Sequence, residues 1–181
     1  ELTVEAVRNL LLGIDIDFYI AMNLDGISAL NSLLGGVTVT LTDDFTSLDP
    51  EMAVGTALTL TGDQAETYVR SRMNVGDGTN RARMERQRAY IDAAFAKASQ
   101  NLRADAGYAG VLFDGLKAYL QTDMKRGRMI NEAYESREYA RAPIVTLEGA
   151  HTEGADGFAE FHPDASALRR LVIRLFYDPI E

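Results

Sequence analysis

Arginine is concentrated in one short stretch of this sequence. The 181-residue chain has a formal net charge of −9, yet six arginines lie between positions 70 and 88: Arg70, Arg72, Arg81, Arg83, Arg86 and Arg88. A guanidinium group binds phosphate or carboxylate oxygens through paired hydrogen bonds, stays charged at any biological pH, and sheds water more readily than an ammonium group. The stretch therefore predicts a site for a polyanionic group, and a pyrophosphate fits it best.

Two predicted helices position these arginines. We expect one helix over 63–72 and a second over about 80–100, separated by the glycine-rich turn Gly76-Asp77-Gly78-Thr79-Asn80. Arg70 and Arg72 belong to the first helix, so they would approach an anion from the opposite side of the turn to the arginines of the second.

The second predicted helix gathers polar side chains on one face. At about 100° per residue, Arg83, Arg86 and Gln87 lie close together around the helix axis. Asn80 is expected to cap this helix, whose first amides would add partial positive charge toward an anion. A second interpretation needs no ligand: the helix is solvated, and its arginines pair with surface carboxylates.

Several motifs of the chain resemble the LytR-CpsA-Psr family. The most specific are the Arg-x-Arg of residues 70–72 and the Arg-x-x-Arg-Gln of residues 83–87, with the turn between them; further similarity lies at 16–20, 33–37, 161–164 and 175–177. Members of this family are extracytoplasmic proteins, mostly of Gram-positive bacteria. They transfer anionic glycopolymers from an undecaprenyl-pyrophosphate carrier to peptidoglycan.

The resemblance implies an α/β fold with a central mixed β-sheet between layers of helices. It implies a single domain over 1–181, with the core match over 1–122 and a C-terminal extension of one family branch over 123–181. Family members carry a membrane anchor and a first part of the domain before the point where this sequence starts. We expect the family's Mg²⁺-binding aspartates in that part, and we expect no metal ligands within this sequence.

The resemblance also assigns roles to residues. Arg70, Arg72, Arg83 and Gln87 would hold the pyrophosphate and carry the transfer. The secondary pyrophosphate-binding candidates are Arg86, which has a structural role as its alternative, Asn80 and Asp77. Many members have an acidic residue where this chain has Asn80; Asp77 is the nearest replacement, and its alternative role is to shape the turn.

A polyprenyl carrier also needs an apolar slot. We expect its lining from an early strand, the helix that follows, and an apolar stripe beside the arginine face: Phe18, Ile20, Ile27, Leu30, Leu34, Ile91 and Phe95. The alternative is that these side chains form ordinary core.

Composition excludes several other classes. The acidic balance argues against broad nucleic-acid binding. The chain has no cysteine, so disulfides and thiol chemistry are excluded. Its two histidines, His151 and His162, are too few and too far apart for a metal site. No apolar run approaches the roughly 20 residues of a membrane helix, and no signal peptide is visible.

Periodicity and turn residues predict the remaining elements. We expect helices over 2–12, 24–34, 105–120, 125–137 and 163–177, and strands over 14–23, 37–41, 58–60, 143–148 and 158–161. The order of strand 14–23, helix 24–34 and strand 37–41 suggests a crossover unit.

We therefore expect a glycopolymer phosphotransferase of the cell envelope, acting on a polyprenyl-pyrophosphate-linked glycan and on peptidoglycan, with Mg²⁺ as cofactor. The alternative is a polyprenyl-phosphate binding protein without transfer activity. A transcriptional attenuator that acts on DNA is the weakest hypothesis, because the chain is acidic and contains no recognisable DNA-binding motif.

Overall fold

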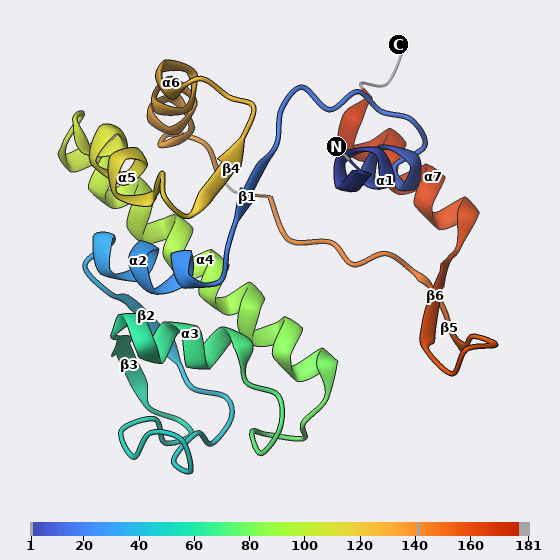
Figure 1. Cartoon of the computed structure of the whole chain (residues 1–181), viewed down its shortest axis with the longest axis horizontal. Helices are drawn as coiled ribbons and strands as arrows, with labels where there is room; N and C mark the ends of the chain where they lie inside the picture. The colour runs from blue at the N-terminus through green and yellow to red at the C-terminus, as the bar shows by residue number, and fades with distance from the viewer. Residues whose placement is uncertain (1, 141, 178–181) are drawn as a thin grey trace. The chain divides into compact units, whose positions relative to one another are not determined.

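The computed structural model describes residues 2–140 and 142–177 (Figure 1). Its contacts divide the chain into two compact units, one of Ile20–Arg141 and one that combines Glu1–Tyr19 with Ala142–Glu181. The prediction of a single domain over 1–181 stays a prediction.

The larger unit contains both arginine-bearing helices. In chain order its elements are β1 (Ile20–Met22), α2 (Asp25–Leu33), β2 (Val37–Thr40), β3 (Ala57–Leu60), α3 (Gly62–Arg70), α4 (Asn80–Ala104), α5 (Tyr108–Leu116), β4 (Leu120–Thr122) and α6 (Arg126–Ser136). The strands pair antiparallel, β1 with β4 and β2 with β3. No helix of the described chain is both long and apolar enough to cross a membrane.

Strand β2 supplies one wall of the core because its side chains alternate. Val37 and Val39 are buried, whereas Thr38 faces outward and shares a 2.8 Å hydrogen bond with Thr59 of β3. Helices α2, α3 and α4 pack around this hairpin, and the core they enclose includes Leu34, Phe45, Met52, Leu60, Tyr68 and Tyr90.

The smaller unit consists of α1 (Leu2–Leu10), the antiparallel hairpin of β5 (Gly149–Glu153) and β6 (Ala159–Pro163), and α7 (Ala165–Phe176). Asp164 caps α7 by accepting a 2.6 Å hydrogen bond from the Ala167 amide. The same hydrogen bond, together with that from Ser166, lowers the pKa of the Asp164 carboxyl.

The mixed α/β class is confirmed, but the strand pairing differs from expectation. The described strands form three separate two-stranded antiparallel sheets. The crossover prediction is therefore wrong, because β1 pairs with β4 and β2 with β3. The strand predicted over 143–148 is also wrong: the partner of β6 is β5, in a segment for which no strand was predicted.

A buried amide ties four elements of the core together. Asn31 of α2 is 1% exposed, and its Nδ2 donates to the Leu60 carbonyl of β3 at 2.7 Å. Its Oδ1 accepts from the Val37 amide and from the Tyr90 hydroxyl of α4, both at 3.2 Å. Burial raises the pKa of Tyr90 to about 12, so this hydroxyl stays protonated and able to donate.

Replacing Asn31 with alanine should leave a buried donor, carbonyl and hydroxyl unsatisfied. We expect Asn31→Ala to lower the free energy of unfolding by about 3 kcal/mol in a urea titration. The matched control is Ser32→Ala on the exposed side of α2, which should change it by less than about 0.5 kcal/mol. Equal effects of the two substitutions would remove Asn31 from the core network.

Candidate functional site

A buried guanidinium group joins the C-terminal end of α3 to α4. Arg86 of α4 is 1% exposed; its Nε donates to the Tyr68 carbonyl at 3.2 Å, and its Nη2 donates to the Ser71 carbonyl. The next residue of α4, Gln87, donates from Nε2 to the Val69 carbonyl at 3.0 Å. These bonds satisfy carbonyls at the end of α3, which would otherwise have no partner there.

The charge of Arg86 is balanced by a residue from outside both helices. Asp43 accepts from Arg86 Nη1 at 2.5 Å, and the ring of Phe45 lies 5.3 Å from the guanidinium carbon. Gly76 of the turn lies against the Asp43 carboxylate; a Cβ atom there would come within 2.4 Å of Asp43 Oδ1, and its φ is +56°. Only glycine meets both conditions, which explains its place in the turn.

The placement of Arg86 favours the structural role over the assignment as a secondary pyrophosphate-binding residue. Its side chain is enclosed by protein and bonded to two backbone carbonyls and one carboxylate. Spacing alone did not distinguish Arg86 from Arg83, because the two residues are three positions apart on one helix. The sequence also provided no signal for Asp43 as the partner of Arg86, because the two residues are 43 positions apart.

The turn before α4 is shaped by Asp77 and capped by Thr79, not by Asn80 as expected. Thr79 Oγ1 accepts from the Ala82 amide at 3.1 Å, and Asp77 Oδ1 accepts from the Thr79 hydroxyl at 2.7 Å and from its amide at 2.8 Å. These hydrogen bonds, the hydroxyl's first, lower the pKa of Asp77. The arrangement matches the turn-shaping alternative for Asp77.

Arg83 holds the clearest unsatisfied donor of the site. Its Nη2 donates to Asn80 Oδ1 at 2.6 Å, but its Nε is buried and has no hydrogen-bond partner among the described residues. A buried donor without a partner is costly, which makes this Nε a position for an acceptor oxygen from a ligand.

The two arginines from the end of α3 differ in their surroundings. Arg70 forms an ion pair with Glu66 one turn earlier on α3. Arg72, exposed after the helix end, makes no hydrogen bond or ion pair with any residue in the described ranges. A phosphate could therefore bind Arg72 directly, whereas it would have to displace or share the Glu66 carboxylate at Arg70.

An apolar cavity of about 470 Å³ opens beside Gln87. Its lining includes five of the seven residues predicted for a lipid slot: Ile27, Leu30, Leu34, Ile91 and Phe95. Residues that the sequence did not single out complete it, namely Met22, Val69, Tyr90, Ala94 and Ala98. Ala94 and Ala98 follow Tyr90 at four-residue spacing, and this helical periodicity was the available signal.

Two predicted lipid-slot residues do not line this cavity. Ile20 of β1 is 51% exposed, and it is Met22, two residues further along the same strand, that reaches the cavity. Phe18 belongs to the other compact unit, so its assignment to this cavity is not supported.

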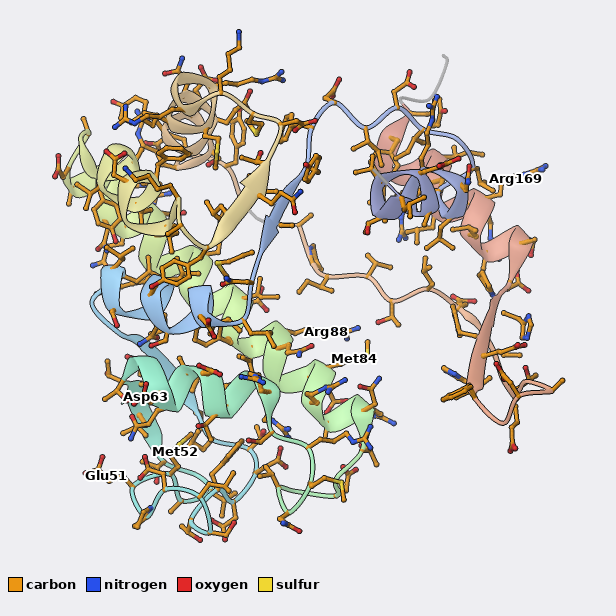
Figure 2. The ribbon with its side chains drawn as sticks, in the orientation of Figure 1. Glu51, Met52, Asp63, Met84, Arg88 and Arg169 are labelled. Atoms are coloured by element: carbon orange, nitrogen blue, oxygen red, sulfur yellow. The ribbon has the colours of Figure 1, made fainter. Side chains whose placement is uncertain are left out.

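The site changes in character along α4. From its N-terminal end, one side of the helix carries Arg83, then Gln87, then the apolar Ile91 and Phe95. At 1.5 Å per residue, the distance along the axis is about 6 Å from Arg83 to Gln87 and about 12 Å from Gln87 to Phe95. Figure 2 shows Met84 and Arg88 projecting from the same helix, one turn apart. The arrangement can hold a molecule with an anionic head and a hydrocarbon tail.

No cluster of three histidine or acidic side chains able to hold a metal ion lies within residues 2–140 and 142–177. The carboxylates beside these arginines already form ion pairs: Asp43 with Arg86, Glu66 with Arg70 and Glu85 with Arg81. These residues alone do not fit a magnesium site. The pyrophosphate assignments of Arg70, Arg72, Arg83 and Gln87 stay predictions.

Removing the charge of Asp43 should destabilise the folded protein, because it leaves the buried guanidinium of Arg86 without a counter-charge. We expect Asp43→Asn to lower the free energy of unfolding by about 3 kcal/mol in a urea titration. The control is Glu85→Ala, which breaks the exposed ion pair between Glu85 and Arg81 and should cost less than about 1 kcal/mol. A loss for Asp43→Asn no larger than for the control would contradict the anchoring role of this pair.

Comparison with known proteins places this site in a family. Over 125 residues, the chain is 30% identical to the polyisoprenyl-teichoic acid–peptidoglycan teichoic acid transferase TagU of Halalkalibacterium halodurans, covering 69% of this chain and 40% of that protein. Over 168 residues it is 26% identical to TagU of Bacillus anthracis, covering 92% of this chain and 54% of that protein. The chain thus spans about half the length of these relatives.

A solved structure and a family model agree with these matches. The structure of the Lin1025 protein from Listeria innocua superposes with a TM-score of 0.68 at 26% identity, covering 95% of this chain and 73% of that chain. The model of the LytR_cpsA_psr family matches residues 1–175. The resemblance predicted from the two arginine motifs is confirmed: the chain belongs to the LytR-CpsA-Psr family.

Proposed function

We propose that the protein containing this chain transfers an anionic glycopolymer from a polyprenyl-pyrophosphate carrier to peptidoglycan. The names of the relatives, teichoic acid transferases that act on peptidoglycan, support the reaction class. Because the chain spans about half of those relatives, the activity is proposed for the intact protein. We propose the same protein to act in the cell envelope, where both substrates lie, and to be held there by a membrane anchor.

The observation that carries this proposal is the succession of side chains along α4. A polyprenyl pyrophosphate has a doubly charged head joined to a long hydrocarbon tail. The cavity beside Gln87 is lined almost wholly by apolar side chains and could take the tail. One helical turn before it, Arg83 presents a buried Nε without a partner, which could receive a phosphate oxygen.

Arg70 and Arg72 would complete the cradle for the head. Both follow Val69, which lines the cavity and is held to α4 by Gln87. On binding, a phosphate oxygen would take a place beside Arg70 now filled by Glu66. Three guanidinium groups could thus offset the charge of a pyrophosphate without any group of this chain forming a covalent bond to it.

The proposed reaction is a phosphoryl transfer. A sugar hydroxyl of peptidoglycan attacks the phosphorus atom nearest the glycan, forming a new P–O bond. The bond from that phosphorus to the bridging oxygen breaks, the lipid monophosphate leaves with its electron pair, and the hydroxyl proton passes to solvent or a base. Such a transfer depends on in-line positioning and on neutralising charge. We propose that Mg²⁺, when bound to the intact protein, supplies further neutralisation.

One observation favours the second candidate, a polyprenyl-phosphate binding protein without transfer activity. Asn80, where many family members have an acidic residue, accepts a hydrogen bond from Arg83 and cannot take a proton from the acceptor. Incubating the intact protein with a polyprenyl-pyrophosphate-linked glycan and peptidoglycan separates the two candidates. Binding of the donor without a phosphodiester product would favour the second.

The head-group assignment predicts the effect of removing Arg83. We expect Arg83→Ala to abolish transfer, lowering its rate at least 100-fold, because a charge-assisted contact to the reacting phosphates is lost. The variant should still melt cooperatively, since Arg83 contributes no core contact comparable to that of Arg86. Wild-type rates in this variant would remove Arg83 from the mechanism.

The tail assignment predicts a different effect from filling the cavity. Ala98→Leu adds bulk to the cavity wall at a half-buried position. We expect it to weaken binding of a C20 prenyl pyrophosphate about tenfold in a calorimetric titration, while binding of inorganic pyrophosphate is unchanged. If the substitution weakened binding of both ligands equally, or of neither, the prenyl chain would not occupy this cavity.

A further inference from the structure

Most arginines that the structure describes pair with a carboxylate, in a chain that contains 27 acidic and 18 basic residues. Ion pairs with Asp or Glu hold the arginines at positions 8, 70, 81, 86, 103, 126, 128 and 137. Within the described ranges, Arg72, Arg83, Arg169, Arg170 and Arg174 form no ion pair. The first two belong to the proposed pyrophosphate site, and the other three lie on α7 of the smaller unit.

Two of the α7 arginines share a face of the helix. Arg170 and Arg174 are four residues apart, so their positive charges are neighbours on the helix surface and repel each other. The fold gives neither a carboxylate within ion-pair distance among the described residues. The helix itself is held in place by Leu168 and Val172, which are its two buried residues.

Both arginines line one cavity, of about 320 Å³, inside the smaller unit. Its other wall is the segment 145–148, and the remaining contributions of α7 are Ala167, Leu168 and Leu171. Glu148 is the single carboxylate among the lining residues, and Asp164, which does not line the cavity, also interacts electrostatically with Arg170. Arg169, by contrast, does not line the cavity, and Figure 2 shows its side chain extending away from α7.

We infer that Arg170 and Arg174 form a second anion site, which binds a phosphate ester. Guanidinium groups provide forked donors suited to phosphate oxygens. The aliphatic side chains beside them can contact the carbon atoms of a phosphate ester, which inorganic phosphate does not have. The inference of an anion site depends only on these contacts. The identity of its natural ligand rests on the proposed function: the ligand is either a phosphodiester of an anionic glycopolymer or the head group of an anionic lipid.

The test follows backbone amide signals of the ¹⁵N-labelled intact protein during titration with a glycerol-phosphate tetramer, a phosphodiester without a lipid chain. We expect saturable shifts in residues 145–148 and 167–174. Binding to the double variant Arg170→Gln/Arg174→Gln should be at least tenfold weaker, whereas Arg169→Gln, the matched control with the same change on the same helix, should stay within twofold. Thermal melting checks that all variants remain folded.

Two results would overturn the inference. The first is that the tetramer shifts the signals of the double variant as it does those of the unsubstituted protein. The second is that Arg169→Gln loses as much affinity as the double variant, which would indicate diffuse attraction to a basic helix. Co-sedimentation with phosphatidylglycerol vesicles distinguishes the sources. Arginine-dependent binding of vesicles without shifts from the tetramer assigns the site to a lipid head group, and shifts from the tetramer assign it to the polymer. Arg83→Ala should leave the α7 shifts intact, so a failure of the transferase proposal is separable from a failure of this site.

Discussion

The buried guanidinium of Arg86 is the constraint on which the rest of the candidate site depends. It bonds to the carbonyls of Tyr68 and Ser71, at the end of α3, and to the Asp43 carboxylate. A charge enclosed to this degree is tolerated only when it is paired and hydrogen-bonded. Because these partners come from two segments and Arg86 belongs to a third, the charge fixes how α3, α4 and the loop at Asp43 meet. Arg70 and Arg72 flank the carbonyls that Arg86 holds, so their position follows from it.

This anchoring allows one helix to serve two chemistries. α4 presents a polar donor face near its start and an apolar face further along, and Gln87 stands at the boundary with its amide bonded to α3. Because Arg86 and Gln87 hold the helices together through backbone carbonyls, Arg72 and the Nε of Arg83 are not needed for that contact. That freedom is what a ligand site needs: Arg72 is unpaired among the described residues, and Arg83 keeps one buried donor unused.

The sequence predicted the parts of this fold that depend on local signals. Both arginine-bearing helices begin within a residue of the expected positions, because each follows a capping threonine: Thr61, in a capping box with Gln64, and Thr79. Local signals do not determine partners across the chain. β1 pairs with β4 about 100 residues later, a register set by tertiary packing, and the antiparallel sheets were therefore not predicted.

The same limit applied within the site. Periodicity grouped Arg83, Arg86 and Gln87 correctly on one side of α4, but it did not show that Arg86 is fully buried whereas Arg83 and Gln87 are only partly buried. Only the approach of Asp43, with Gly76 making room for it, turns Arg86 inward. Family resemblance identified the arginines of the site, whereas the structure showed which of them retain unsatisfied donors.

The central claim is that this site holds an amphiphilic pyrophosphate with its head at the arginines and its tail in the apolar cavity. A crystal structure of the intact protein with a polyprenyl pyrophosphate tests it most directly. The account predicts a phosphate oxygen within about 3 Å of Arg83 Nε and prenyl carbons between Ile91 and Leu30. Phosphates bound elsewhere, with Arg83 Nε still without a partner and the cavity empty, would contradict it.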